Sequence, residues 1–189
     1  WQPEVVKERR FTDREPAQAA VLIPLVMRGT QTASLTVLLT ERTAHLSTHS
    51  GQIAFPGGRV DESDADVTAA ALREAYEEVG LEYRYVDVLG TLPVYTTGTA
   101  FQVTPVVALV QPDFTLLPNA FEVADTFEVP LTFLMDPAHH QRHAFEWEGV
   151  RREWFSMPFH ETVAGEVRER FIWGATAGML RNFYRFLSA

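Results

Sequence analysis

The chain contains no cysteine and a single lysine, Lys7, among its 189 residues. Without cysteine there is no disulfide framework, zinc–thiolate site or thiol nucleophile, so carboxylates and histidines remain as the reactive side chains. This composition is compatible with a reducing cytoplasm. Long apolar runs are also lacking: the longest spans residues 19–27 and contains Pro24, whereas a membrane span needs roughly 18 apolar residues. We therefore expect a folded cytoplasmic protein without a membrane partner.

Positive charge is scarce as well, with 16 Lys and Arg against 25 Asp and Glu and a formal net charge of −9. Proteins that bind a nucleic-acid backbone need clustered bases, so we expect no nucleic-acid partner. The negative charge is concentrated in residues 59–82, where eight acidic residues accompany two arginines, a net charge of −6. The length and the apolar content predict an N-terminal arm over residues 1–18 and a single domain over residues 19–189.

The residue pattern predicts strands and helices of one α+β domain, since no linker or repeat separates them. Two helices are expected, over residues 64–79 and 172–187. Residues 121–135 fit either a short helix or a strand. Strands are expected at residues 19–27, 34–40, 52–55, 83–91 and 101–110, with a hairpin built on residues 144–147 and 152–155.

The first helix is expected to begin at Ser63 or Asp64 as its N-cap and to end at Gly80. At about 100° per residue, three carboxylates fall on one face of it, namely Glu74, Glu77 and Glu78. The opposite, buried stripe is expected to consist of Leu72, Ala75, Tyr76 and Val79.

An acidic helix face is most simply a solvated surface. Against that interpretation, Glu74 and Glu78 form a like-charged pair at i and i+4, close to the negative C-terminal end of the helix. A bound divalent cation would relieve both unfavourable interactions, and Mg²⁺ takes oxygen ligands that substrate phosphates and waters complete. Arg73 beside them either orients Glu77, contacts a phosphate, or forms a surface ion pair worth little.

Residues 73–81, Arg-Glu-Ala-Tyr-Glu-Glu-Val-Gly-Leu, together with Phe-Pro-Gly-Gly at residues 55–58, resemble the Nudix box. This loop–helix–loop motif belongs to metal-dependent hydrolases that cleave nucleoside diphosphates linked to another moiety. One departure concerns the spacing, because Asp64 stands where the general pattern has Glu, and Arg73 comes one residue late. The resemblance implies a Nudix α/β/α sandwich with a mixed β-sheet between helices.

The same resemblance implies a site that binds Mg²⁺ or Mn²⁺. Arg73 would hold the carboxylates in place. The general base would be either Glu74 or Glu122, which lies in a stretch similar to a downstream Nudix loop, although Glu122 also fits a plain surface residue. The implied metal ligands are the carboxylates of Glu74, Glu77 and Glu78 and the backbone carbonyl of Gly58.

A longer stretch, residues 38–58, looks like the segment distinctive of coenzyme A pyrophosphatases, and residues 172–180 are similar to the C-terminal helix of that branch. Two positions depart from it: Thr43 stands where Ser is usual, and Ser47 where Arg is common, which puts one phosphate contact in doubt. The implied reaction splits CoA or an acyl-CoA into 3′,5′-ADP and 4′-phosphopantetheine or its acyl form.

The 3′-phosphate of CoA needs cationic partners, and Arg42, Arg59 or the Arg151–Arg152 pair could supply them, although each also fits a surface ion pair. Four aromatic side chains are interpreted as packing in the core or in the hairpin rather than as base-stacking surfaces, namely Trp147, Trp154, Phe155 and Trp173.

The expected partner is a small phosphorylated substrate, and a homodimer is left open. Two alternatives stay open at this point. One keeps the fold with another substrate, such as ADP-ribose, a dinucleotide or a modified nucleoside triphosphate. The other is a non-catalytic Nudix-like sensor, which the intact glutamates disfavour.

Overall fold

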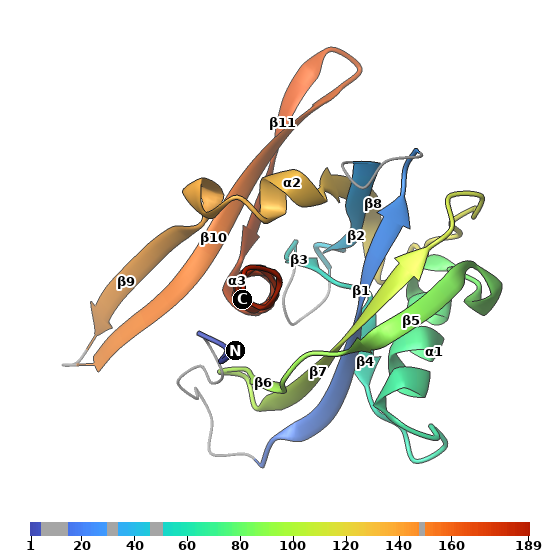
Figure 1. The fold of residues 1–189 in the computed structure, drawn as a ribbon, viewed down its shortest axis with the longest axis horizontal. Helices are drawn as coiled ribbons and strands as arrows, with labels where there is room; N and C mark the ends of the chain where they lie inside the picture. The colour runs from blue at the N-terminus through green and yellow to red at the C-terminus, as the bar shows by residue number, and fades with distance from the viewer. Residues whose placement is uncertain (5–14, 30–33, 46–50, 148–149) are drawn as a thin grey trace.

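A central mixed β-sheet separates two layers in this computed structural model, which describes residues 1–4, 15–29, 34–45, 51–147 and 150–189. Helix α1 (Val67–Val79) covers one face of the sheet, and helix α3 (Gly174–Leu187) lies on the other face beside a second, antiparallel sheet (Figure 1). This arrangement confirms the predicted α/β/α sandwich with a mixed sheet between helices.

The central sheet has eight strands, and its main path runs β3–β2–β1–β7–β5. Strand β1 runs parallel to β7, from Ala17 opposite Phe101 to Val26 opposite Val110, and the other pairs are antiparallel. Strands β4, β6 and β8 pair with β1, β7 and β2. The bounds are β1 Ala17–Met27, β2 Leu35–Arg42, β3 Ile53–Ala54, β4 Gly57–Arg59, β5 Val86–Thr91, β6 Tyr95–Thr96, β7 Phe101–Val110 and β8 Val123–Pro130.

Strand β1 is apolar along most of its length because both of its faces are buried. Leu22 and Val26 pack toward α1, whereas Ile23 and Leu25 pack into the core on the side of α3, as the period of two in a strand requires. Pro24 is paired with Ala108 of β7, but its nitrogen faces the other edge of β1, as the Leu22 N–H that donates to the Pro56 carbonyl does, and there it lies between the residues that pair with β4 and those that pair with β2.

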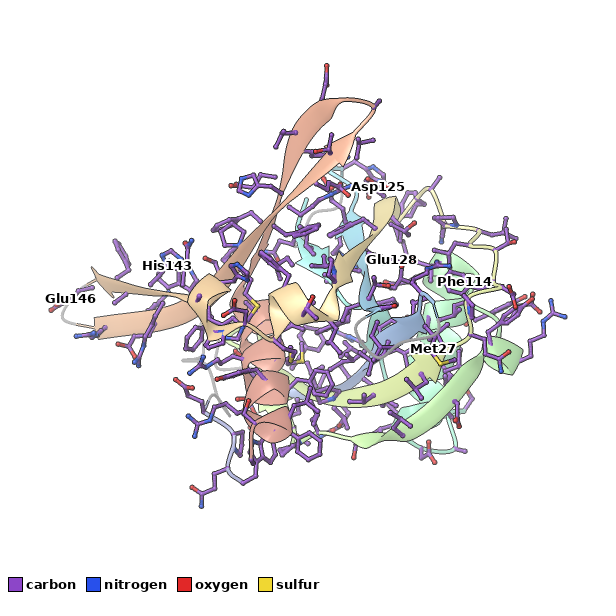
Figure 2. All side chains as sticks on the ribbon, turned by 45° about the horizontal axis from the view of Figure 1, so that its top comes forward. Met27, Phe114, Asp125, Glu128, His143 and Glu146 are labelled. Carbon is purple, nitrogen blue, oxygen red and sulfur yellow. The ribbon has the colours of Figure 1, made fainter. Side chains whose placement is uncertain are left out.

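The second sheet has the order β11–β10–β9 (β9 Gln141–Trp147, β10 Val150–Val163, β11 Glu166–Trp173). It extends away from the central sheet, so that His143 and Glu146 on β9 lie far from Met27 at the end of β1 (Figure 2). The remaining short elements are the 3₁₀ turns η2 (Tyr83–Tyr85) and η3 (Pro137–His139) and helix α2 (Leu131–Leu134). In the part of the chain that the structure describes, no helix is both long and apolar enough to cross a membrane.

Several predicted boundaries change. The predicted strand over residues 83–91 starts with η2 and becomes a strand only at Val86, and residues 121–135 contain both alternatives, first β8 and then α2. Strand β11 was not predicted, and the last helix begins at Gly174 rather than at residue 172. The predicted turn residues 30–31 and 148–149 lie outside the described residues.

Helix α1 differs from the prediction at its start and in its buried face. Its N-cap is Asp66, whose carboxylate accepts a hydrogen bond of 2.8 Å from the Ala69 N–H, so the predicted cap at Ser63 or Asp64 is wrong. Tyr76 is 52% exposed and packs beside Tyr83, with ring centroids 5.9 Å apart. Glu78 is buried instead, at 5% exposure, because β4 packs along that flank of the helix and widens its covered face.

The start of the chain packs on α3. The Glu4 N–H donates to Asn182 Oδ1 at 3.0 Å, and the Glu4 carboxylate accepts from Arg181 at 2.8 Å. Most of the predicted N-terminal arm, residues 5–14, lies outside the described residues, so its boundary at residue 18 stays a prediction.

Candidate functional site

The C-terminal end of α1 is fixed to the loop that precedes β8. Gly80 ends the helix with φ of 72°, a left-handed conformation that glycine adopts readily, and a Cβ there would lie 2.9 Å from the Leu117 backbone nitrogen. The last helical carbonyls, those of Glu78 and Val79, accept hydrogen bonds of 2.8 Å from the Asn119 and Leu117 N–H groups. These bonds satisfy the exposed end of the helix and hold the loop beside its carboxylates.

The chain bends at Pro56 into β4, and the first two residues of that strand, named the Gly57–Gly58 turn below, lie where two close contacts exclude any side chain. Gly57 has φ of 159°, and a Cβ on it would overlap the Ala20 carbonyl oxygen and lie 2.6 Å from Val21 Cα. A Cβ on Gly58 would lie 2.5 Å from the Glu74 carboxylate. The two glycines therefore bring the backbone of β4 into direct contact with strand β1 and with the carboxylates of α1.

Glu78 is the most buried of these carboxylates. It accepts a hydrogen bond of 3.1 Å from the Gly57 N–H, and Arg42 Nη1 lies 3.7 Å from its second oxygen. Burial raises the pKa of Glu78 to about 7, although the Gly57 N–H and the Arg42 charge oppose the shift and the charges of Glu74 and Glu122 add to it.

Glu74 and Glu122 complete a group of carboxylates that affect one another. Burial raises the pKa of Glu74, against the effect of its hydrogen bond from Arg73, and the charges of Glu77 and Glu122 raise it further. Glu122 belongs to the loop held by α1, and its carbonyl accepts a hydrogen bond of 3.0 Å from the Thr43 N–H. The structure thus brings this sequence-predicted residue near Glu74 and Glu78.

Arg73 binds three carboxylates of the acidic stretch, residues 59–82. Its guanidinium donates to both oxygens of Asp64, at 2.9 and 3.0 Å, and to Glu74 and Glu77, each at 3.0 Å, and it also reaches the Arg59 carbonyl at 3.0 Å. Of the three roles considered for Arg73, the hydrogen bond to Glu77 fits the one in which Arg73 orients that carboxylate. The two departures in spacing also meet here, because the unusual Asp64 is the partner of the shifted arginine.

The candidate metal ligands fit a hard divalent cation of the kind that Nudix hydrolases generally need. All of these ligand atoms are oxygens, and two buried or half-buried carboxylates, Glu74 and Glu78, flank the two glycines, which have no side chains. Glu77 is different, since its side chain is 57% exposed and bound to Arg73. Mg²⁺ needs only one or two carboxylates together with waters and phosphates; the described ranges contain no group of three or more acidic or histidine side chains placed to hold an ion.

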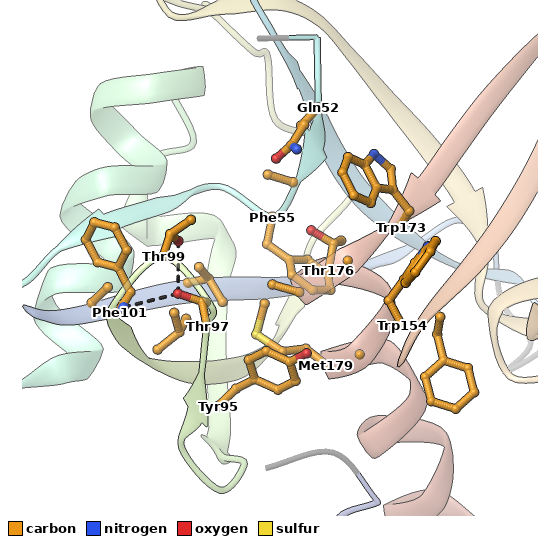
Figure 3. A pocket seen from close by; sticks show the side chains of 18 of the residues that line it. Gln52, Phe55, Tyr95, Thr97, Thr99, Phe101, Trp154, Trp173, Thr176 and Met179 are labelled. Carbon is orange, nitrogen blue, oxygen red and sulfur yellow. Dashed lines mark hydrogen bonds between the residues drawn. The ribbon is translucent and has the colours of Figure 1, made fainter. Parts of the chain in front are cut away.

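A cavity of about 1350 Å³ opens on the other side of the Gly57–Gly58 turn. Figure 3 shows Trp154 and Trp173 on one side of it and Thr97, Thr99 and Phe101 on the other. Of the two kinds of packing expected for the aromatic residues, Phe155 is in the core, whereas Trp173 is 40% exposed and lines the cavity, as Trp154 does. The five arginines of the lining include all those considered from the sequence: Arg42, Arg59, Arg142, Arg151 and Arg152.

Sequence reasoning did not find Arg170 on β11, which is only 3% exposed. It donates to Glu161 at 2.5 Å and to Glu41 and Asp125 at 2.6 Å each, and it lies 4.1 Å from the centre of the Phe127 ring. Glu41 directly precedes Arg42, and Asp125 follows Glu122 by three residues. The ion pairs of the buried Arg170 therefore join β10 and β11 of the second sheet to β2 and β8 of the central sheet.

Comparison with known proteins places these features in one family. The model of the NUDIX domain matches residues 16–158. An uncharacterized Nudix hydrolase named NudL, from Citrobacter koseri, is 44% identical over 166 residues, which are 87% of this chain and 80% of that protein. NudL of Shigella flexneri is 42% identical over 174 residues, 90% of this chain and 84% of that protein.

The fold also resembles the crystal structure of a MutT/nudix family protein from Enterococcus faecalis. That match has a TM-score of 0.52 at 16% identity and covers 94% of this chain and 64% of the other. The box at Gly57–Gly58 and α1, the surrounding sandwich and the family match all agree, and the chain belongs to the Nudix hydrolase family.

Proposed function

We propose that this Nudix hydrolase cleaves the diphosphate of coenzyme A or an acyl-CoA, using Mg²⁺ or Mn²⁺. The products are 3′,5′-ADP and 4′-phosphopantetheine or its acyl form. The resemblance of residues 38–58 to the coenzyme A pyrophosphatase branch favours this substrate over other nucleoside diphosphate derivatives.

The observation that carries the proposal is the cavity beside the Gly57–Gly58 turn. Its volume of about 1350 Å³ is above the roughly 300–1000 Å³ of ordinary small-molecule sites. Its walls are largely apolar, with Tyr95, Phe101, Trp154 and Met179 among them, yet arginines also line it. A bulky substrate with a long flexible arm and several phosphates suits a space of this size better than a single nucleotide does.

Each residue of the site has a part in this chemistry. When bound, a divalent cation neutralises the diphosphate and lowers the pKa of an attacking water. Glu74 and Glu78 would hold the ion, with Glu77 and the Gly58 carbonyl as further ligands, and Arg73 keeps the glutamates in position. Glu122 accepts the proton of the water whose oxygen bonds to phosphorus, while the bridging P–O bond breaks. Arg42 and Arg59 offset the remaining negative charge of the substrate.

The test incubates the purified protein and Mg²⁺ or Mn²⁺ with CoA, acetyl-CoA, ADP-ribose, a dinucleotide and a modified nucleoside triphosphate, and identifies the products by mass. We expect CoA to give 3′,5′-ADP and 4′-phosphopantetheine. Strong cleavage of ADP-ribose with intact CoA would overturn the substrate assignment. If no compound is cleaved with either metal, the protein is a binding module instead.

Two variants separate the metal ligands from the base. Glu78→Gln removes one ligand charge and should lower kcat/KM by at least about a hundredfold, with partial recovery at high metal concentration. Glu122→Gln should lower kcat at unchanged metal affinity, and its activity should recover at higher pH, where hydroxide replaces the base-activated water. Full activity in Glu78→Gln would contradict the metal assignment.

A further inference from the structure

We propose that the wall of the cavity on the second sheet binds the nucleoside part of the substrate. This hairpin wall consists of Arg142, Arg151, Arg152, Trp154 and Trp173. The two tryptophans stack against the purine base, and the arginines bind a phosphate group on the ribose that is separate from the diphosphate. The choice of substrate rests on the proposed function, whereas the surface itself follows from the geometry below.

The two tryptophans form a firm aromatic surface at the edge of the cavity. Trp173 pairs with Ser156 across the strands β10 and β11, and Trp154 lies two residues before Ser156, so the tryptophans are diagonal neighbours within reach of one ligand. Both lie on the same side of the cavity in Figure 3. Aromatic surfaces of this kind stack on a nucleobase through its π-face.

Trp154 is fixed in place before any ligand arrives. Its ring stacks on that of His143, with centroids 5.3 Å apart and planes inclined by 16°. His143 Nε2 in turn lies 2.7 Å from the hydroxyl of Ser156, which is fully buried. A side chain held by its neighbours loses little rotamer freedom when it binds, so Trp154 suits a stacking role.

The arginines of the cavity fall into two separate groups. Arg42 lies 3.7 Å from Glu78, next to the carboxylates, and Arg59 follows Gly58 on β4 with its guanidinium over the Phe101 ring, whereas Arg142, Arg151 and Arg152 belong to the hairpin. Glu153 is the one acidic residue of the hairpin that lines the cavity, and it pairs with Arg142 at 2.6 Å and with Arg151 at 2.8 Å. Among the hairpin residues that line the cavity, three arginines therefore accompany one carboxylate.

Two groups of arginines at separate places suit a ligand with two separate phosphate groups. A diphosphate at the carboxylate site and a phosphomonoester on the ribose have this arrangement, with the base between the tryptophans. Arginine is well suited to phosphate because its planar group donates two parallel hydrogen bonds.

The opposite side of the cavity suits the other arm of the substrate. The threonine hydroxyls on this side hydrogen-bond to neighbouring residues. The hydroxyl oxygens of Thr97 and Thr99 lie 3.1 Å apart, and the Phe101 N–H donates to Thr97 Oγ1 at 3.1 Å (dashed lines in Figure 3). Its one arginine, Arg59, lies over the Phe101 ring at 5.4 Å. A phosphomonoester would find fewer cations there than at the hairpin wall.

The kinetic test compares CoA with dephospho-CoA, which lacks only the phosphate on the ribose. For the unchanged protein with Mg²⁺, we expect KM to be about tenfold higher for dephospho-CoA, because one charge-assisted contact is lost. Arg152→Gln should raise KM for CoA by about tenfold, leave KM for dephospho-CoA unchanged and leave kcat unchanged. The control Arg84→Gln removes one positive charge from an arginine outside the cavity and should keep the preference.

Trp154→Leu tests the base. It should raise KM for CoA and dephospho-CoA by the same factor with little change in kcat, because the base is common to both compounds. Equal effects of Arg152→Gln on the two substrates, or an unchanged preference for CoA in that variant, would overturn the phosphate assignment. An unchanged KM in Trp154→Leu would overturn the stacking assignment.

A binding measurement keeps this inference separate from the proposed function. Tryptophan fluorescence of the metal-loaded protein should be quenched by 3′,5′-ADP at about tenfold lower concentration than by 5′-AMP, and Arg152→Gln should abolish that difference. If CoA is not cleaved but this difference is present, the proposed function fails and the hairpin wall stands. If 3′,5′-ADP and 5′-AMP bind the unchanged protein equally, the hairpin wall is not a phosphate site.

Discussion

Gly57 offers a sharp test of how closely β4 packs against the sheet. A Cβ at this residue would overlap the Ala20 carbonyl oxygen and lie 2.6 Å from Val21 Cα, and both of these atoms belong to the backbone of a central strand. Gly90 on β5 is a matched control, since it has φ of 153° against 159° for Gly57 and no atom within 4 Å of the corresponding Cβ position. The two sites therefore share their backbone strain and differ in the space available.

The backbone strain of an alanine at such φ costs about 1–3 kcal/mol at either site. In Gly57→Ala, the overlap with Ala20 and Val21 adds about 1–3 kcal/mol, because a central strand cannot move away freely. We expect Gly57→Ala to melt below Gly90→Ala, by about 2–4 °C for each kcal/mol of this difference in a chain of this size. Differential scanning calorimetry of both variants measures it.

Activity should separate the two variants further. A displaced β4 breaks the hydrogen bond from the Gly57 N–H to Glu78, so Gly57→Ala should lose most of its hydrolysis while Gly90→Ala keeps it. Equal melting temperatures and equal activities in the two variants would refute the close contact on which the site rests.

Three further predictions concern charge. Arg170→Met leaves three carboxylates without their buried partner and should lower the free energy of unfolding by about 3 kcal/mol or more, whereas the exposed Arg168→Met should cost less than about 1 kcal/mol in the same urea titration. Burial alone would raise the pKa of Asp125, but the hydrogen bond and charge of Arg170 outweigh it and hold this pKa below its ordinary value. The stability from this pair is therefore complete above about pH 4 and is lost as the pH falls through the lowered pKa, so Asp125→Asn should flatten the acid limb of the unfolding free energy against pH. Because the pKa of Glu78 is raised to about 7, a cation that binds this carboxylate below that pH displaces a proton. Apparent Mg²⁺ affinity should therefore increase from about pH 6 to pH 8. Calorimetry in two buffers of different ionisation enthalpy measures the released proton, and Glu78→Gln should remove this proton release.

The carboxylate helix could be predicted from the sequence because its signals are local, whereas strand β4 at the two glycines was not predicted. Glu74, Glu77 and Glu78 lie within one helical turn, and a helix fixes their spacing whatever surrounds it. The first residue of the helix was harder to predict, since Asp64 and Asp66 are both suitable caps. Asp66 takes that place because Asp64 is bound to Arg73, a contact between residues nine apart.

Strand β11 could not be predicted because its buried face carries charge. Arg168 and Arg170 alternate with Val167, Glu169 and Phe171, a pattern that normally indicates solvent on the arginine side. Here the arginine side meets Glu41 and Asp125, which come from strands β2 and β8 far away in the sequence. In the sequence, a residue such as Arg170 looks solvent-exposed, because the carboxylates that pair with it when it is buried lie on strands far away along the chain. The sequence likewise did not show that Trp154 and Trp173 border a cavity, since aromatic residues indicate packing without saying on which side of a sheet a cavity lies.

The two halves of the site lie on opposite sides of the Gly57–Gly58 turn. Glu74 and Glu78 contact the turn from α1, whereas the cavity borders the same two glycines from the side of α3. In a sheet, side chains usually fill both faces of a strand and separate the layers. Two consecutive residues without side chains leave only the β4 backbone between the carboxylates and the cavity at this point, and Arg42 both lines the cavity and lies 3.7 Å from Glu78. The glycines of the box are thus required by the geometry on both sides of the sheet, and a side chain at Gly58 would displace Glu74 even where the fold survives.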